Sequence, residues 1–124
     1  MSLVAVVARD LIIATRIGEA AIAAGHDVTR VDQPADLPPP GSVALVFVDW
    51  GGRDDDWAQQ IREWKAVVRS GGGPRVVVFG PHTDLAAHSS ARDAGISPMI
   101  ARSKLVLGLG SWFTRLDTSA GVGD

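Results

Sequence analysis

The residue run 42–50, SVALVFVDW, restricts the possible folds more than any other part of the sequence. It is short, apolar and rich in valine, and it ends in a single carboxylate, Asp49. A strand buried on both faces of a parallel sheet has this continuous apolar character, and ligands bind beyond the carboxyl ends of such strands. The run therefore predicts the central strand of a parallel sheet, with Asp49 at the edge where a functional site forms.

Apolar segments and helical patterns alternate along the rest of the chain. Further strands are expected at 3–7, 27–31, 75–79 and 98–101, and helices at about 11–24, 55–70, 85–94 and 105–116. Asp10 is placed to cap the first helix and Gly25 to end it. This alternation predicts an α/β fold with a doubly wound, five-stranded parallel sheet in the flavodoxin-like order 2-1-3-4-5.

The segment 33–41, QPADLPPPG, lies where a doubly wound fold has its second crossover helix. Four of its nine residues are proline. Proline interrupts a helix, and it pushes the residue before it toward an extended conformation. We therefore expect the second crossover helix to be absent, or reduced to an extended connection or a single short turn.

Length and composition indicate one ordinary globular domain. We expect it over residues 1–117 of the 124, followed by a disordered tail at 118–124. The net charge of −2 gives no basis for nucleic-acid binding, and the absence of cysteine excludes disulfides and thiolate chemistry. No apolar run approaches the roughly 18 residues of a membrane span. The first residues, MSLVAVVARD, indicate a strand and not a signal peptide, so we expect a cytoplasmic protein without nucleic-acid or membrane partners.

The pattern resembles the receiver (CheY-like) domain of two-component signal transduction over nearly the whole chain. Asp49, at the end of VFVD, stands where a receiver keeps its phospho-accepting aspartate. The motif ARDAG, a short strand, and then Arg102 and Ser103 are similar to the receiver's alanine–glycine helix end and the lysine–proline after its fifth strand. The motifs ARDL, FGPH and ARSKL also resemble those of a group of uncharacterised bacterial receiver-like proteins.

The resemblance fails at the metal site. A receiver holds Mg²⁺ with an acidic pair after its first strand, and the ion neutralises the incoming phosphoryl oxygens. Those positions are Ala8 and Arg9 here, and only Asp10, one place further on, is acidic. An arginine in this position would repel Mg²⁺.

Three further receiver positions are changed. Gly80 replaces the switch threonine or serine, so no hydroxyl is available to follow a phosphoryl group. Met99 replaces the aromatic switch residue. Arg102 replaces the lysine, which keeps the charge but not the compact ammonium group.

These changes predict a degenerate receiver, or pseudo-receiver: a non-catalytic interaction module without a metal or other cofactor. We expect Asp49 to form an ion pair with Arg9 or Arg102. One alternative is an atypical receiver that is still phosphorylated on Asp49, with Asp10 and Asp49 sharing a metal. Another is a sensor of small anions at the edge formed by Arg9, Arg102 and Ser103.

Other polar clusters are weaker candidates. Asp54–Asp56 could bind a cation but is more typical of a solvated helix start. The group of His82, Asp84, Ser89 and Ser90 has no spacing tied to a catalytic triad, so no catalytic residue is predicted.

Tryptophans bear on the expected partner surface. Trp57 and Trp64 share one helical stripe and are expected in the core. Trp50 and Trp112 could instead lie at a partner surface, and Trp50 could cover the pocket. By resemblance to receivers, the expected partner is another protein or a second copy of the chain, bound through the fourth helix, fifth strand and fifth helix of the receiver.

Overall fold

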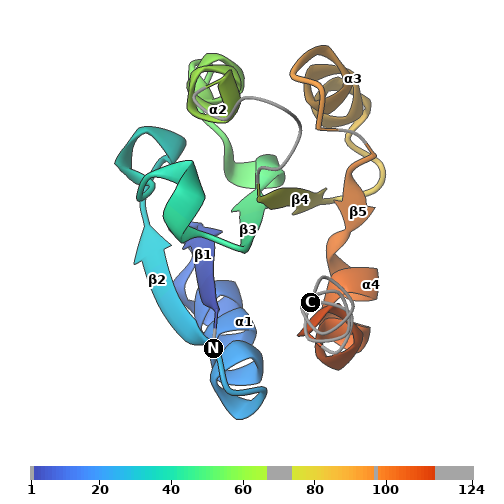
Figure 1. Ribbon diagram of the computed structural model, residues 1–124. Helices are drawn as coiled ribbons and strands as arrows, with labels where there is room; N and C mark the ends of the chain where they lie inside the picture. Colours follow the sequence, from blue (N-terminus) through green and yellow to red (C-terminus); the bar gives the residue numbers. More distant parts are fainter. Residues whose placement is uncertain (1, 67–73, 97, 114–124) are drawn as a thin grey trace.

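A five-stranded parallel sheet forms the centre of the computed structural model, which describes residues 2–66, 74–96 and 98–113. The spatial order is β2-β1-β3-β4-β5 (Figure 1), and each neighbouring pair is parallel. The strands are β1 (Leu3–Val7), β2 (Asp27–Val31), β3 (Leu45–Asp49), β4 (Arg75–Gly80) and β5 (Ile100–Ala101). The predicted fold class and strand order are confirmed.

Two layers of helices cover the sheet. Helices α2 (Trp57–Ala66) and α3 (Leu85–Asp93) lie on one face, and α1 (Leu11–Ala23) and α4 (Arg102–Leu107) lie on the other (Figure 1). Helix α4 begins three residues before the expected Leu105, and it is capped at Gly108, before a further helical stretch at 109–113. The parts of the expected helices at 67–70 and 114–116, and the predicted tail at 118–124, lie outside the described residues.

Strand β3 has the buried character that its sequence predicts. Val46, Phe47 and Val48 are fully buried, and their side chains alternate between two apolar clusters, one on each face of the sheet. Trp57 and Ile61 of α2 pack on one face, while the ring of Phe47 meets Phe113 edge-on, with 5.9 Å between ring centroids, on the other. Because both faces are packed, Asp49 is the first residue of β3 with access to water.

A proline strap, residues 33–42, replaces the second crossover helix. It consists of two short 3-10 turns, η1 (Pro34–Asp36) and η2 (Pro40–Ser42), joined by extended backbone. The prediction that no full helix forms here is confirmed, with two turns instead of one. The strap packs against α2: the indole Nε1 of Trp64 donates a hydrogen bond of 2.8 Å to the carbonyl oxygen of Pro38.

Trp50 is fully buried in the apolar cluster under α2 and α3, so it offers no partner surface. The chain turns immediately after β3 into a short 3-10 turn, η3 (Trp50–Gly52), which directs the indole into the core. Trp57 and Trp64 pack in the same cluster, as predicted. Within the described residues, no helix is long and apolar enough to cross a membrane.

Candidate functional site at the carboxyl edge of the sheet

The carboxyl ends of β1, β3, β4 and β5 bring the predicted site residues to one edge of the sheet. Arg9 and Asp10 follow β1, Asp49 ends β3, Gly80 ends β4, and Arg102 and Ser103 follow β5. The edge is therefore assembled as the sequence predicts. The ion pairs that form at this edge differ from the predicted ones.

Asp49 is half-buried and has no ion-pair partner among the described residues. The expected pair with Arg9 or Arg102 is not formed. Burial raises the pKa of Asp49, and it outweighs the opposing effects of the Arg102 charge and of the backbone N–H groups of Gly52 and Gly51. The carboxylate is therefore partly desolvated, and the Arg102 charge and the two backbone N–H groups offset only part of the cost of that desolvation.

Arg102 reaches Asp10 instead. Its Nη2 donates to Oδ2 of Asp10 at 2.7 Å, and the bond lowers the pKa of Asp10. The other oxygen, Oδ1, accepts from the backbone nitrogens of Ile12 and Ile13 at 3.0 and 3.4 Å, which confirms that Asp10 caps α1. The acidic residue closest to the receiver's metal position is thus used to cap a helix and to bind an arginine.

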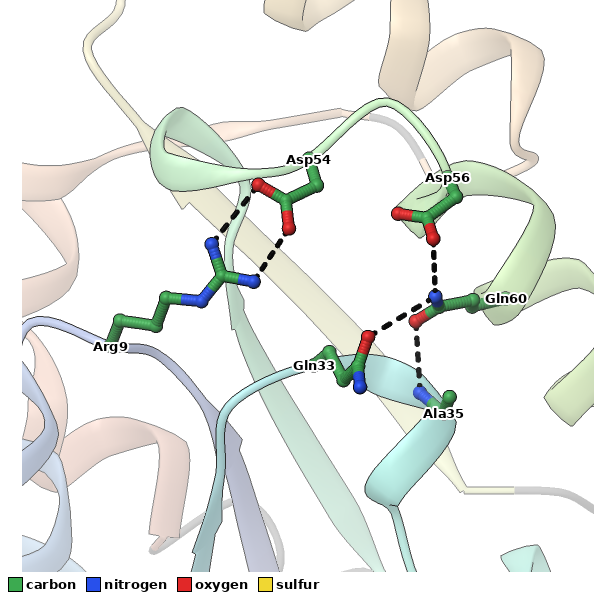
Figure 2. A network of polar contacts seen from close by, with 6 residues as sticks. All are labelled: Arg9, Gln33, Ala35, Asp54, Asp56 and Gln60. Atoms are coloured by element: carbon green, nitrogen blue, oxygen red, sulfur yellow. Dashed lines mark hydrogen bonds and ion pairs between the residues drawn. The ribbon is translucent and has the colours of Figure 1, made fainter.

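Arg9 forms a two-pronged ion pair with Asp54. Its Nη1 and Nη2 donate to Oδ1 and Oδ2 of Asp54 at 3.0 and 2.6 Å, as Figure 2 shows. The pair lowers the pKa of Asp54 and raises that of Arg9. About half of each side chain is exposed (49% and 50%), and the guanidinium carbon lies 5.4 Å from the ring centroid of Trp57. Arg9 therefore points away from Asp49 and toward the start of α2.

A second group of polar contacts joins the start of α2 to the proline strap (Figure 2). The side-chain amide of Gln60 donates to Asp56 at 2.9 Å and to Gln33 at 3.4 Å, and its oxygen accepts from the backbone nitrogen of Ala35 at 3.0 Å. Asp54 and Asp56 of the acidic run thus have structural partners. The sequence signal that could have indicated the pairing of Arg9 with Asp54 is that the acidic run follows β3, at the same edge of the sheet as Arg9.

Gly80 has no room for the switch residue of a receiver. A Cβ at this position would lie 2.9 Å from Sδ of Met99 and 3.0 Å from the backbone nitrogen of Gly51. Gly51 and Gly80 are therefore in close backbone contact, and the place of the switch hydroxyl is filled by the turn after Asp49.

Asp84 and the two histidines of the β4–α3 region make structural contacts. Asp84 caps α3 through the backbone nitrogen of Ala87, at 3.0 Å, and Nε2 of His88 lies 3.0 Å from the carbonyl oxygen of His82. Ser103 lines a hollow of about 650 Å³ between the β4–α3 turn and α4. In the described part of the chain, no three His, Cys, Asp or Glu side chains come together in a way that could hold a metal ion.

Solved structures of receiver domains and related proteins are similar to this chain. A response regulator receiver domain protein from Clostridium thermocellum matches with a TM-score of 0.72 at 14% identity, over 100% of both chains. A putative pilus assembly protein (cpaE) from Burkholderia thailandensis matches with a TM-score of 0.70 at 14% identity, over 95% of this chain and 99% of that one. A response regulator from Thermotoga maritima matches with a TM-score of 0.67 at 18% identity, over 94% and 97%.

No family model and no curated protein matches the sequence. The structural matches therefore establish the fold: the chain is a module with the CheY-like receiver architecture.

Proposed function

We propose that the chain is a cytoplasmic, non-catalytic pseudo-receiver that signals by protein association and not by metal-dependent phosphorylation of Asp49. The observation that carries this proposal is the pair of Arg102 and Asp10. The guanidinium binds one carboxylate of the edge, and its charge also acts on Asp49. A fixed cation thus interacts with both carboxylates that a receiver of this sequence could offer to Mg²⁺.

The contact between Gly80 and Gly51 supports the same conclusion. A receiver needs a side-chain hydroxyl at the end of its fourth strand, and here the backbone of the neighbouring turn fills that space. The two arginines also have partners of their own, Asp54 and Asp10, which weighs against a sensor that binds small anions through them.

Calorimetric titration tests the loss of receiver chemistry. Mg²⁺ and then beryllofluoride, a mimic of the aspartyl phosphate, are added to the wild type and to Asp49→Ala. We expect no saturable heat in either protein. A sub-millimolar Mg²⁺ affinity that disappears in Asp49→Ala would show that the edge still acts as a receiver.

The proposed association surface is formed by α3, β5 and α4, which correspond to the fourth helix, fifth strand and fifth helix of a receiver. Leu107, 90% exposed, lies here beside two hollows of about 750 and 650 Å³ that also share His82 and Ala101. In a twofold dimer, the exposed leucine of each copy can enter the apolar hollow of the other copy. Because each copy carries both the leucine and the hollow, the surface is complementary to itself. We therefore take a second copy of the chain as the partner.

Light scattering after size-exclusion chromatography tests this interface. We expect a wild-type dimer, a monomer for Leu107→Glu, and a dimer for the control Ile22→Glu, since Ile22 is 64% exposed on α1, away from the proposed surface. A wild type that stays monomeric at about 1 mM, where even an interaction of about −4 kcal/mol would be half-saturated, would exclude the second copy. A different protein would then be the remaining partner.

A further inference from the structure

In the five residues after β3, Trp50 to Asp54, two glycines lie against the Asp49 carboxylate; we call this segment the 50–54 cap. A Cβ on Gly52 would lie 3.3 Å from Oδ2 of Asp49, and one on Gly51 would lie 3.6 Å from Oδ1. These distances place the glycine backbone against both carboxylate oxygens. The cap therefore limits the access of solvent molecules to the Asp49 carboxylate from the side on which Gly51 and Gly52 lie.

The inner part of the cap is fixed by packing. Trp50 is fully buried, and the guanidinium of Arg53 folds back onto it, donating to its carbonyl oxygen at 3.0 Å. Gly51 rests on the β4–α3 turn, where an added Cβ would lie 2.7 Å from Cδ of Pro81. These contacts hold the cap down near Trp50. At its far end the carbonyl oxygen of Asp54 accepts from the backbone nitrogen of Trp57 at 3.2 Å, and the side chain of Asp54 makes a second contact.

The far end is joined to β1 by the ion pair of Asp54 with Arg9. Both side chains are about half exposed, so water and salt reach the pair. Exposed ion pairs are weak and are screened by salt. Breaking this contact should therefore cost less free energy than breaking the packing contacts of the cap.

We propose that the 50–54 cap shields the Asp49 carboxylate, and that the ion pair between Arg9 and Asp54 is its latch. When the latch is intact, the Asp49 carboxylate is partly shielded. When the pair is screened by salt or lost by substitution, the cap lifts from its Asp54 end and the carboxylate becomes accessible. This proposal does not depend on the proposed function, because access to Asp49 is distinct from whether Asp49 binds metal or phosphate.

The test measures how fast Asp49 reacts with a water-soluble carbodiimide and glycine ethyl ester, which convert an accessible carboxyl group to an amide. Peptide mass spectrometry gives the rate at Asp49 relative to that at Asp36, an exposed carboxylate in the strap. The latch variants are Asp54→Asn, which keeps the side-chain shape, and Arg9→Gln, which also removes the contact with Trp57. The control is Arg16→Gln, on the exposed face of α1.

We expect slow labelling of Asp49 in the wild type and in the control. In the latch variants the relative rate should rise by up to about fivefold, the factor that corresponds to one exposed ion pair. The double variant Arg9→Asp with Asp54→Arg restores an opposite-charge pair and should return the rate toward that of the wild type.

Salt provides the same test without a substitution. Raising NaCl from about 0.01 M to 1 M shortens the screening length from about 30 to 3 Å, so the relative rate at Asp49 should rise in the wild type but not in Asp54→Asn. Equal relative rates in wild type and Asp54→Asn at low salt, or a wild-type Asp49 that reacts as fast as Asp36, would overturn the proposal. If Arg9→Gln fails to fold, Asp54→Asn and the salt series decide the outcome.

Discussion

Gly80 and Gly51 lie backbone to backbone beside Asp49, with only 3.0 Å between the Cβ position of Gly80 and the amide nitrogen of Gly51. The turn after β3 is thus packed onto the end of β4. In a receiver this is where a hydroxyl side chain moves toward the phosphoryl group. Here the packing leaves no space for a hydroxyl side chain at position 80.

Gly80→Thr should therefore destabilise the protein and not create a switch. The new side chain meets backbone atoms of Gly51, which cannot move aside as cheaply as the flexible end of Met99. Overpacking of this kind costs about 1–3 kcal/mol of the free energy of unfolding. Urea unfolding followed by circular dichroism measures it.

Gly41→Ala is the matched control, because nothing lies within 4 Å of a Cβ at Gly41. It should change the unfolding free energy by less than about 1 kcal/mol. If Gly80→Thr were as stable as this control, the turn after Asp49 would have to be free to move away from β4.

Asp49→Asn should stabilise the protein at neutral pH. Burial raises the pKa of Asp49 above its ordinary value of 3.8, so the folded state holds a proton that the unfolded state releases. The contribution of Asp49 to the free energy of unfolding therefore falls as pH rises from 3.8 through the raised pKa. Above that interval the wild type carries the full cost of an ionised, half-buried carboxylate, and the asparagine does not.

Chemical denaturation of both proteins between pH 3 and 8 checks this prediction. The two curves should converge at the acid end and separate as pH rises, with the variant the more stable. A wild type that is more stable than Asp49→Asn at pH 7 would mean that Arg102 and the glycine amides compensate the carboxylate fully.

Local sequence patterns were sufficient to predict the fold. Strand β3 is recognisable because a continuous apolar run has few alternatives, and the prolines of 33–41 exclude a helix by covalent geometry. The start of α4 was missed because Arg102 follows Ala101, whose side chain makes no capping hydrogen bond, so the sequence carries no start signal there. The sequence left the position of Trp50 open because apolar periodicity ends at Asp49, and a turn that folds a side chain back into the core leaves no periodic trace.

The sequence predicts which residues lie at the site better than it predicts which ion pairs they form. Strand order alone brings Arg9, Asp49 and Arg102 to one edge. Which carboxylate each arginine selects depends on the path of the connecting loops. The turn after Asp49 brings Asp54 within reach of Arg9, and the cap of α1 holds Asp10 within reach of Arg102.

Asp10→Ala should lower the thermal midpoint more than Asp10→Ser. Alanine removes both the α1 cap and the bond to Arg102, whereas serine can still accept from the first amides of the helix. Thermal unfolding by circular dichroism at pH 7 measures both variants. Equal losses would show that the arginine contact matters and that the cap does not.

The same carboxylate makes a pH-dependent contribution of opposite sign to that of Asp49. The bond from Arg102 lowers the pKa of Asp10 below 3.8, so its stabilising effect is present above that value and is lost as pH falls through the lowered pKa. The gap in thermal midpoint between wild type and Asp10→Ala should therefore shrink at the acid end of the range. A gap that is independent of pH would exclude a role for the charged form.

Trp64→Phe should loosen the proline strap without removing the aromatic ring from the core. The substitution deletes the indole N–H that donates to Pro38, at a cost of about 1 kcal/mol for a single hydrogen bond, plus a term for the smaller ring. Leu37 and Val43 remain buried, so the strap should stay in place on average but open more often. Limited proteolysis detects this as faster cleavage within 33–42.

Gln60→Ala, which removes the other link to the strap at Ala35, should act in the same direction, whereas Lys65→Ala, an exposed neighbour on α2, should not. Unchanged cleavage in both Trp64→Phe and Gln60→Ala would mean that apolar burial alone holds the strap and that its polar contacts with α2 are incidental.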